Sequence, residues 1–173
     1  HSGAMDWQPN VDAIQWFLAE VWPEIHAELP QLNFHFAGRA MPKELFNSLP
    51  AGAFCEGEVE SAEAFAADKD ILVVPLKSGG GIRVKILEAF AQGKLVISTE
   101  VGIQGIKVLP KMHFLKANST TDFVEALQWA VVHPGLAQCV ADDGQSFVRQ
   151  HYNAPEIMAS LVEGINGVLK CKV

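Results

Sequence analysis

A short apolar run that leads into three glycines constrains this chain more than any other feature. Asp70-Ile-Leu-Val-Val-Pro75 predicts a buried strand, because a continuous apolar run is typical of a parallel strand covered on both faces. The spacing over Ile82–Gln92 predicts a helix that Gly93 closes, and Leu95–Ser98 predicts another apolar strand. Strand, helix and strand in this order form a βαβ unit, so we expect a Rossmann-like parallel sheet with helices on both faces.

The same alternation extends along the rest of the chain. We expect an opening helix with Asn10 as its cap, and Pro23 must break it, kink it or start a second short helix. Ligands bind at the carboxyl ends of parallel strands, so the loops after the expected strands are the places to look for a site. Further expected strands are Leu32–Ala37, Ala53–Cys55 and Met112–Leu115, and further expected helices are Pro42–Leu49, Ser61–Ala67, Thr121–Val132, Gly135–His151 and Ala154–Lys170.

Composition excludes several classes of protein. The 173 residues suit a single domain, and 49% apolar with 19% charged residues is typical of a globular chain. The net charge of −7 means that basic residues are not in excess, so we expect no nucleic-acid partner. No apolar run approaches the roughly 20 residues that a membrane helix needs. Three scattered cysteines and six histidines without ligand spacing predict neither disulfides nor a metal site, and they suit a cytoplasmic location.

The glycine loop predicts a site for an anion. Gly79, Gly80 and Gly81 precede a helix whose first amides lack partners, and Arg83 and Lys85 add positive charge in the first turn. This pattern suits a phosphate or a diphosphate. Two familiar phosphate motifs are excluded, because the residue before Lys85 is a valine and the same valine replaces the third glycine of the dinucleotide fingerprint.

Two further side chains have open interpretations. Lys85, Glu88 and Gln92 share one stripe of the expected helix, opposite an apolar arc that includes Ile82. Glu88 either pairs with Lys85 on a solvated face or faces the cleft and accepts hydrogen bonds from ligand hydroxyls. Arg39, after the second strand, either reaches a phosphate or is an ordinary surface arginine. We expect the four tryptophans to pack against other side chains rather than to stack against a sugar ring.

Several segments resemble one family in the right order. Gly81–Thr99 followed by Gly102-Ile-Gln-Gly105 is similar to the donor-binding signature of family 4 ("group 1") glycosyltransferases, which are retaining enzymes of the GT-B fold. Met5–Asn10, Phe36-Ala-Gly38 and Gly57-Glu-Val59 resemble earlier parts of the same C-terminal domain, so the resemblance covers roughly residues 3–150.

The resemblance implies a role for each matching residue. Glu88 matches a glutamate that binds the ribose hydroxyls, and Gly79–Ile82 matches the loop whose amides meet the diphosphate and the sugar. Thr99 and Gly102 match the next loop on the donor side, and Val59 matches the region beside the nucleobase. The family implies a nucleotide-sugar as substrate and no cofactor.

One position departs from the family pattern. The first motif glutamate falls eight positions before Glu88, where this chain has Gly80. Arg83 or Lys85 is therefore expected to supply donor binding instead. The departure keeps open a non-catalytic nucleotide-binding or interaction domain on the same fold, and an unrelated doubly wound protein is a third reading.

A GT-B enzyme has two Rossmann-like domains, and residues 1–173 suffice for the C-terminal one alone. We expect its first strand to be truncated, and residues 1–5 to be either native or a tag remnant. A truncated first strand would leave unpaired backbone groups at a gap in the sheet. We therefore expect the fragment to self-associate and to catalyse no sugar transfer by itself. In the full-length protein the resemblance implies transfer of a hexose to a glycan or lipid-linked acceptor in polysaccharide assembly, in the cytoplasm or at the inner membrane face.

Overall fold

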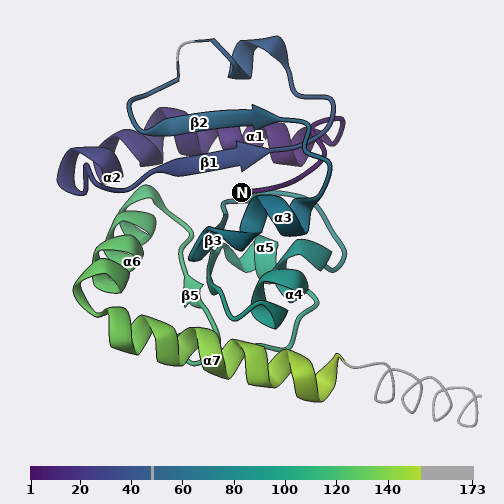
Figure 1. The fold of residues 1–173 in the computed structure, drawn as a ribbon, viewed down its shortest axis with the longest axis vertical. Helices are drawn as coiled ribbons and strands as arrows, with labels where there is room; N and C mark the ends of the chain where they lie inside the picture. The colour runs from purple at the N-terminus through teal and green to yellow at the C-terminus, as the bar shows by residue number, and fades with distance from the viewer. Residues whose placement is uncertain (48, 153–173) are drawn as a thin grey trace, which may run out of the picture.

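The computed structural model describes residues 1–47 and 49–152 (Figure 1). Within them the strands pair in parallel, as the alternation predicts, but they form two sheets where we expected one, with helices packed around both. One sheet has the order β1-β2 and the other the order β3-β4-β5. The strands are β1 (Phe34–Ala37), β2 (Ala53–Gly57), β3 (Ile71–Val74), β4 (Leu95–Ser98) and β5 (Leu115–Lys116).

The segment His1–Gly3 lies at the seam between the two sheets. Its backbone pairs with the end of β1, because the Ala37 amide donates to the His1 carbonyl and the Gly3 amide donates to the Ala37 carbonyl, each at 3.0 Å. On the other side, Nδ1 of His1 lies 3.0 Å from the carbonyl oxygen of Val73 in β3. The seam therefore brings the carboxyl ends of β1 and β3 close to the first residues of the chain.

The opening helix runs from Gln8 to Glu28 in three pieces, α1 (Gln8–Trp16), a π-helical turn η1 (Phe17–Val21) and α2 (Trp22–Glu28). The expectation that Asn10 caps it is wrong. Pro9 occupies one of the first two helical positions, which a proline favours because it has no amide to leave unpaired, and Asn10 is a buried residue inside the helix. Pro23 starts α2, which is one of the three outcomes expected for it.

The other helices follow the expected order with shifted ends. In place of the helix expected at Pro42–Leu49 the structure has the short 3-10 turn η2 (Lys43–Leu45). The expected helix at Ala154–Lys170 lies outside the described residues. Ser61 caps α3 as expected, because its hydroxyl accepts from the Ala64 amide. The remaining helices are α3 (Ala62–Ala67), α4 (Val84–Ala91), α5 (Glu100–Ile103), α6 (Thr120–Val132) and α7 (Pro134–His151).

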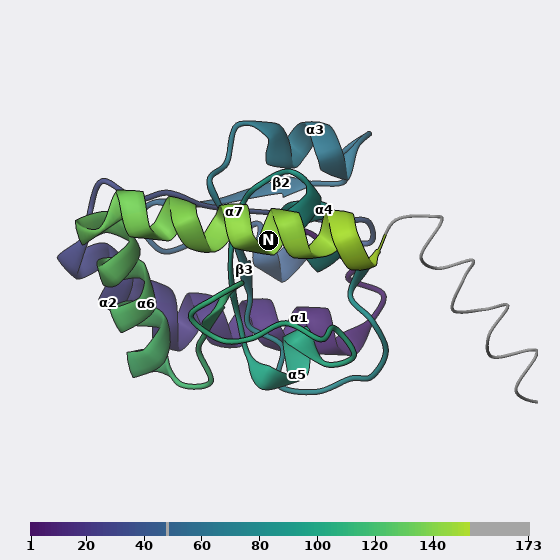
Figure 2. The same ribbon diagram turned by 90° about the horizontal axis from the view of Figure 1, so that it is seen from below.

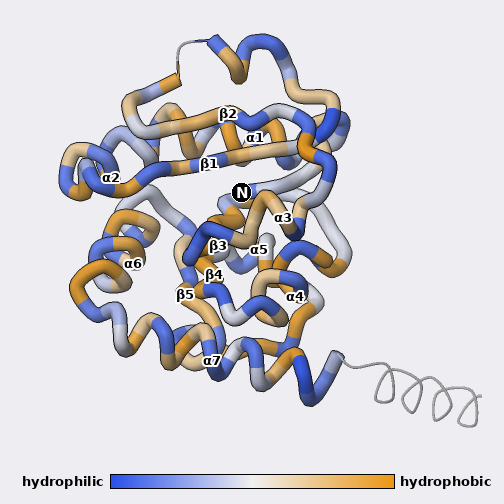
Figure 3. Tube along the Cα trace, in the orientation of Figure 1, coloured by the Kyte–Doolittle hydropathy of each residue, from blue (hydrophilic) through white to orange (hydrophobic). Residues whose placement is uncertain are grey.

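Two apolar clusters hold the sheets to their helices, and in Figure 3 hydrophobic and hydrophilic colouring alternates along the helices. In the first cluster Phe17 joins the opening helix to β1 and α6, with ring centroids 4.6 Å from Phe34 and 5.6 Å from Phe123. In the second, α7 runs beside α4, and Figure 2 shows α7 crossing this side of the molecule. Among the described helices, none is long and apolar enough to cross a membrane.

Candidate functional site

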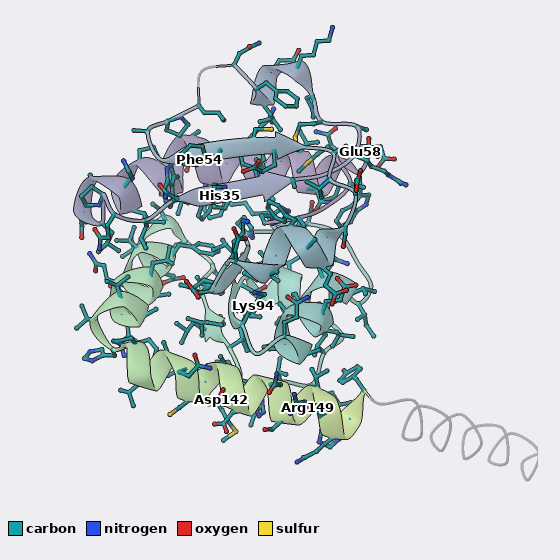
Figure 4. All side chains as sticks on the ribbon, viewed as in Figure 1. His35, Phe54, Glu58, Lys94, Asp142 and Arg149 are labelled. Carbon is teal, nitrogen blue, oxygen red and sulfur yellow. The ribbon has the colours of Figure 1, made fainter. Side chains whose placement is uncertain are left out.

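A cavity of about 530 Å³ lies where the carboxyl ends of β1 and β2 face the first turns of α4. This is the edge where parallel sheets bind ligands. Glu58, which follows β2, projects at this edge (Figure 4). The wall is formed by four segments of the chain: Ser2–Ala4 with Trp7 and Asn10, Ala37–Arg39, Glu58–Val59 with Ala62, and Ile82–Lys85 with Glu88.

The glycine loop leads from β3 to this cavity. Gly79 and Gly81 have positive φ values of 107° and 84°, a region in which a side chain would be strained. A Cβ at Gly79 would also lie 2.6 Å from the indole of Trp7, so the loop needs glycine here to pass close to that ring. Gly79, Gly80 and Gly81 are exposed, and none of them is among the residues that line the cavity.

The helix after the loop begins two residues later than predicted. Arg83 has extended dihedrals and occupies the cap position, and α4 starts at Val84. Ile82 therefore precedes the helix and is 49% exposed at the cavity mouth, so its expected place on the apolar arc is wrong.

Arg83 is the most unusual side chain of the site. It is 8% exposed, its guanidinium lies 4.9 Å over the ring of Trp7, and Nη1 donates to the carbonyls of Gly80 and Gly81. Nε and Nη2 are buried and have no hydrogen-bond partner among the described residues. Burial lowers the pKa of Arg83. Because buried polar groups are almost always paired in proteins, two unpaired guanidinium N–H groups beside a cavity indicate an anion-binding position.

Lys85 points toward the first residues of the chain. Its Nζ lies 2.7 Å from the Ser2 carbonyl, 3.1 Å from Nε2 of His1 and 3.4 Å from Oδ1 of Asn10. Burial, followed by the charge of Arg83, lowers the pKa of Lys85 to about 7. The amine therefore has protein partners in all three directions in which an ammonium group can donate.

Glu88 lies on the next turn of α4, where it is exposed to solvent on the cavity wall. The described ion pairs do not join it to Lys85, which distinguishes this geometry from the solvated pair considered for the sequence. In this position its carboxylate is accessible to the hydroxyl groups of a ligand inside the cavity.

The structure gathers part of the remaining predicted set at the cavity. Val59 and Arg39 are on the wall, and Arg39 forms an exposed ion pair of 3.0 Å with Asp6 at the rim. Thr99 and Gly102 are buried outside the lining. The Thr99 hydroxyl donates to the carbonyl of Leu76 and accepts from the Gly102 amide at 2.9 Å, so this pair anchors the start of α5 beneath the glycine loop.

The wall residues that were not predicted as site residues include Asn10, Trp7 and Glu58. Asn10 was interpreted as a cap, Trp7 as a packing residue, and Glu58 was not singled out. A signal for Asn10 did exist, because it shares the buried stripe of α1 with Ala13 and Ile14, and a polar residue on an apolar stripe needs specific partners. In the part of the chain that the structure describes, no group of three or more His, Cys, Asp or Glu side chains could hold a metal ion.

Comparisons with known proteins agree with this architecture. The profile of a family described as "Glycosyl transferases group 1" matches residues 1–132. A curated relative from Klebsiella pneumoniae, named "Uncharacterized 44.6 kDa protein in cps region", is 22% identical over 162 residues, which cover 88% of this chain and 42% of the relative. The chain thus spans less than half the length of that relative.

Solved structures share the fold at low sequence identity. The C-terminal domain of LpcC, a glycosyl transferase group 1 family protein from Francisella tularensis, has a TM-score of 0.70 and 18% identity over 82% of this chain and 80% of that one. Anabaena HepE in complex with UDP has a TM-score of 0.75 and 16% identity, covering 88% of this chain and 46% of that one. TarM has a TM-score of 0.77 and 14% identity, covering 94% and 34%.

Proposed function

The chain belongs to the group 1 glycosyl transferases, and from this premise we propose that its cavity binds the nucleoside diphosphate of a sugar donor. One observation carries the proposal: Arg83 lines the same cavity as Glu88, and two nitrogens of its buried guanidinium, Nε and Nη2, have no hydrogen-bond partner among the described residues. A diphosphate supplies the acceptor oxygens that this cation lacks, and its pentose supplies hydroxyl donors for the carboxylate.

The wall suggests an orientation for the nucleotide. The diphosphate would lie at the first turn of α4, where the helix amides and dipole favour an anion, with Gly79–Gly81 at the rim beside it. Glu88 would accept from the pentose hydroxyls, and the base would extend toward Val59 and Glu58 at the end of β2. Solved complexes of HepE with UDP and with UDP-glucose support a nucleotide-sugar as the ligand.

Positive charge at this position also has a role in the reaction. As the glycosidic bond breaks, negative charge grows on the departing diphosphate, and a fixed guanidinium with helix amides stabilises that charge without reorganisation. We propose that the full-length protein transfers a hexose with retention to a glycan or lipid-linked acceptor in polysaccharide assembly on the cytoplasmic side. The relative from a cps region and a TarM complex that contains UDP and alpha-GlcNAc-glycerol support this assignment.

Calorimetry with UDP and with GDP tests the proposal and shows which nucleobase the cavity prefers. We expect one of the two to bind the chain, and Glu88→Ala to weaken that binding by about tenfold, the loss typical of a hydrogen bond to a charged group. Glu125→Ala on α6 removes a carboxylate remote from the cavity and should leave affinity unchanged. Absence of binding for both nucleotides, or equal affinities of wild type and Glu88→Ala, would contradict the proposal.

A non-catalytic nucleotide-binding domain is the second candidate, and Gly80 favours it. A Cβ built at Gly80 meets nothing within 4 Å, so a glutamate would fit sterically where the family has one, yet this chain carries none there. The two candidates differ in the activity of the full-length protein. Sugar transfer from the selected nucleotide-sugar supports the enzyme, and binding without transfer supports the second candidate.

A further inference from the structure

Lys85 and Arg83 are two residues apart, but their charged groups differ in how many of their N–H groups have partners in the protein. The guanidinium of Arg83 keeps two N–H groups without partners among the described residues. The amine of Lys85 faces the Ser2 carbonyl, Nε2 of His1 and Oδ1 of Asn10. Since Nδ1 of His1 lies against the Val73 carbonyl, a proton there leaves Nε2 as an acceptor for the lysine. Arg83 therefore has unused hydrogen-bonding capacity, whereas Lys85 is engaged by the protein.

Asn10, which lies on α1, also contacts the amine of Lys85. It is 5% exposed, and while its Oδ1 faces Lys85, its Nδ2 donates to the Ala4 carbonyl at 2.8 Å. The packing is tight, because a Cβ at Gly3 would lie 2.7 Å from Nδ2 of Asn10. One amide side chain on α1 thus connects the chain entering that helix with the amine of α4.

The segment between these contacts is a wall of the cavity. Ser2, Gly3 and Ala4 line it, and their backbone is fixed against the end of β1 by the Gly3 amide. The Met5 amide adds a bond of 2.9 Å to the Arg39 carbonyl. Release of Lys85 or Asn10 would leave this wall held mainly by its backbone bonds to Ala37 and Arg39, which would then open more often.

We propose that Lys85 and Asn10 are positioning residues that hold the Ser2–Ala4 wall in place, and that they favour nucleotide binding without contacting the diphosphate. The inference rests on the proposed function insofar as the cavity holds a nucleotide. The lowered pKa of Lys85 agrees with the burial of its amine among uncharged protein groups.

Paired ligands distinguish positioning from direct contact. We expect Lys85→Met and Asn10→Ser each to weaken UDP and UMP by a similar factor of about three to ten, as loss of wall geometry predicts. The matched control is Arg83→Met at the cap of the same helix, which should weaken UDP about tenfold more than UMP because the arginine is the residue proposed to contact the diphosphate. If calorimetry shows that the chain binds GDP rather than UDP, GDP and GMP are titrated in place of UDP and UMP. Circular dichroism establishes that each variant is folded at the temperature of the titration.

Two outcomes of the titrations would overturn the proposal. If Lys85→Met weakens UDP far more than UMP, the lysine contacts the diphosphate. If the folded variants bind both nucleotides as wild type does, the network has no role in binding. Hydrogen exchange supplies a test that needs no ligand: the Gly3 and Met5 amides should exchange at least about tenfold faster in Lys85→Met and Asn10→Ser but not in Arg83→Met. Unchanged exchange contradicts positioning, whereas failure of wild type to bind nucleotides contradicts the proposed function alone.

Discussion

At the scale of single residues, the buried amine of Lys85 couples stability to pH. Its pKa is about 7 in the folded chain and near the ordinary value of 10.5 when unfolded, so the unfolded chain binds more protons between these values. The free energy of unfolding contributed by this group therefore rises with pH across that window, and its burial is most costly below pH 7.

Comparison with Lys85→Met isolates this effect. Urea denaturation of both proteins at several values between about pH 6.5 and pH 9.5, a range that covers most of this window, should show wild type gaining stability relative to the variant as pH rises. A constant difference across this range would mean that the pKa of Lys85 is not lowered.

Gly38 provides a residue-scale test of the contact between β1 and the N-terminal segment. A Cβ built there would lie 1.8 Å from the carbonyl oxygen of Gly3, where backbone meets backbone and neither can move alone. We expect Gly38→Ala to lower the free energy of unfolding by about 1–3 kcal/mol or more, as for other overpacked sites. Gly135→Ala is the control, because a Cβ there meets nothing within 4 Å, and denaturant unfolding should show it to be nearly neutral.

Side-chain hydrogen bonds to backbone carbonyls decide two placements that sequence patterns did not predict. Ile82 fits an apolar arc by spacing, but Arg83 bends its side chain back to Gly80 and Gly81 and delays the helix by two residues. The role of Lys85 depends on Ser2, which is 83 residues away. Periodicity reports local structure, and it cannot report which distant carbonyl a side chain will reach.

At the scale of elements, α6 begins with a reciprocal pair of hydrogen bonds. The Ser119 hydroxyl accepts from the Asp122 amide at 3.2 Å, and the Asp122 carboxylate accepts from the Ser119 amide at 3.0 Å and the Asn118 amide at 2.8 Å. The bond from Asn118, ahead of those from Ser119, lowers the pKa of Asp122. This contribution to stability is present above the ordinary carboxyl pKa and is lost as pH falls through the lowered one.

Removal of this cap should destabilise α6 without altering its packing. We expect Ser119→Ala to lower the free energy of unfolding by about 1 kcal/mol at neutral pH, measured by urea denaturation. Ser61→Ala serves as a comparison, because α3 has no buried residue, so loss of its cap should affect the local amide exchange of α3 more than global unfolding. Equal unfolding curves for Ser119→Ala and wild type would contradict the role assigned to the cap.

The elements show which sequence signals are dependable. Strands β3 and β4 and helices α6 and α7 follow long or strongly apolar patterns, and their observed ends lie within one residue of those expected. The strand expected at Met112–Leu115 appears as Leu115–Lys116, because Lys111 has a φ of 65° and its amide bonds back to the Phe114 carbonyl at 2.7 Å. A local turn thus uses the backbone groups that a strand would have needed.

At the scale of the whole molecule, a nucleotide that binds the native chain must also stabilise it. At a concentration of about 100 times Kd the linkage adds roughly 2.7 kcal/mol. For a chain of this size that corresponds to a rise in Tm of about 5–10 °C. Thermal denaturation with UDP or GDP should show this rise for wild type and a smaller one for Glu88→Ala at the same nucleotide concentration. Identical Tm values with and without nucleotide would argue against a site in the native state.

The parallel α/β architecture followed from the alternation of apolar strands and helices, and the region of the site followed from where the glycine loop fell. The cavity itself did not. It requires the ends of β1 and β2, the start of α4 and the segment Ser2–Ala4 to meet, and no single stretch of sequence describes that meeting.

The cavity straddles the seam between the two sheets. Gly38, Arg39 and Val59 belong to the β1-β2 half, whereas Arg83 and Glu88 belong to the half built on β3. A molecule that fills this space touches both halves at once, so any sliding or hinging of one against the other would break its contacts. A nucleotide bound there as proposed would therefore add a second link between two halves that the apolar cluster containing Phe34 and Val73 already joins.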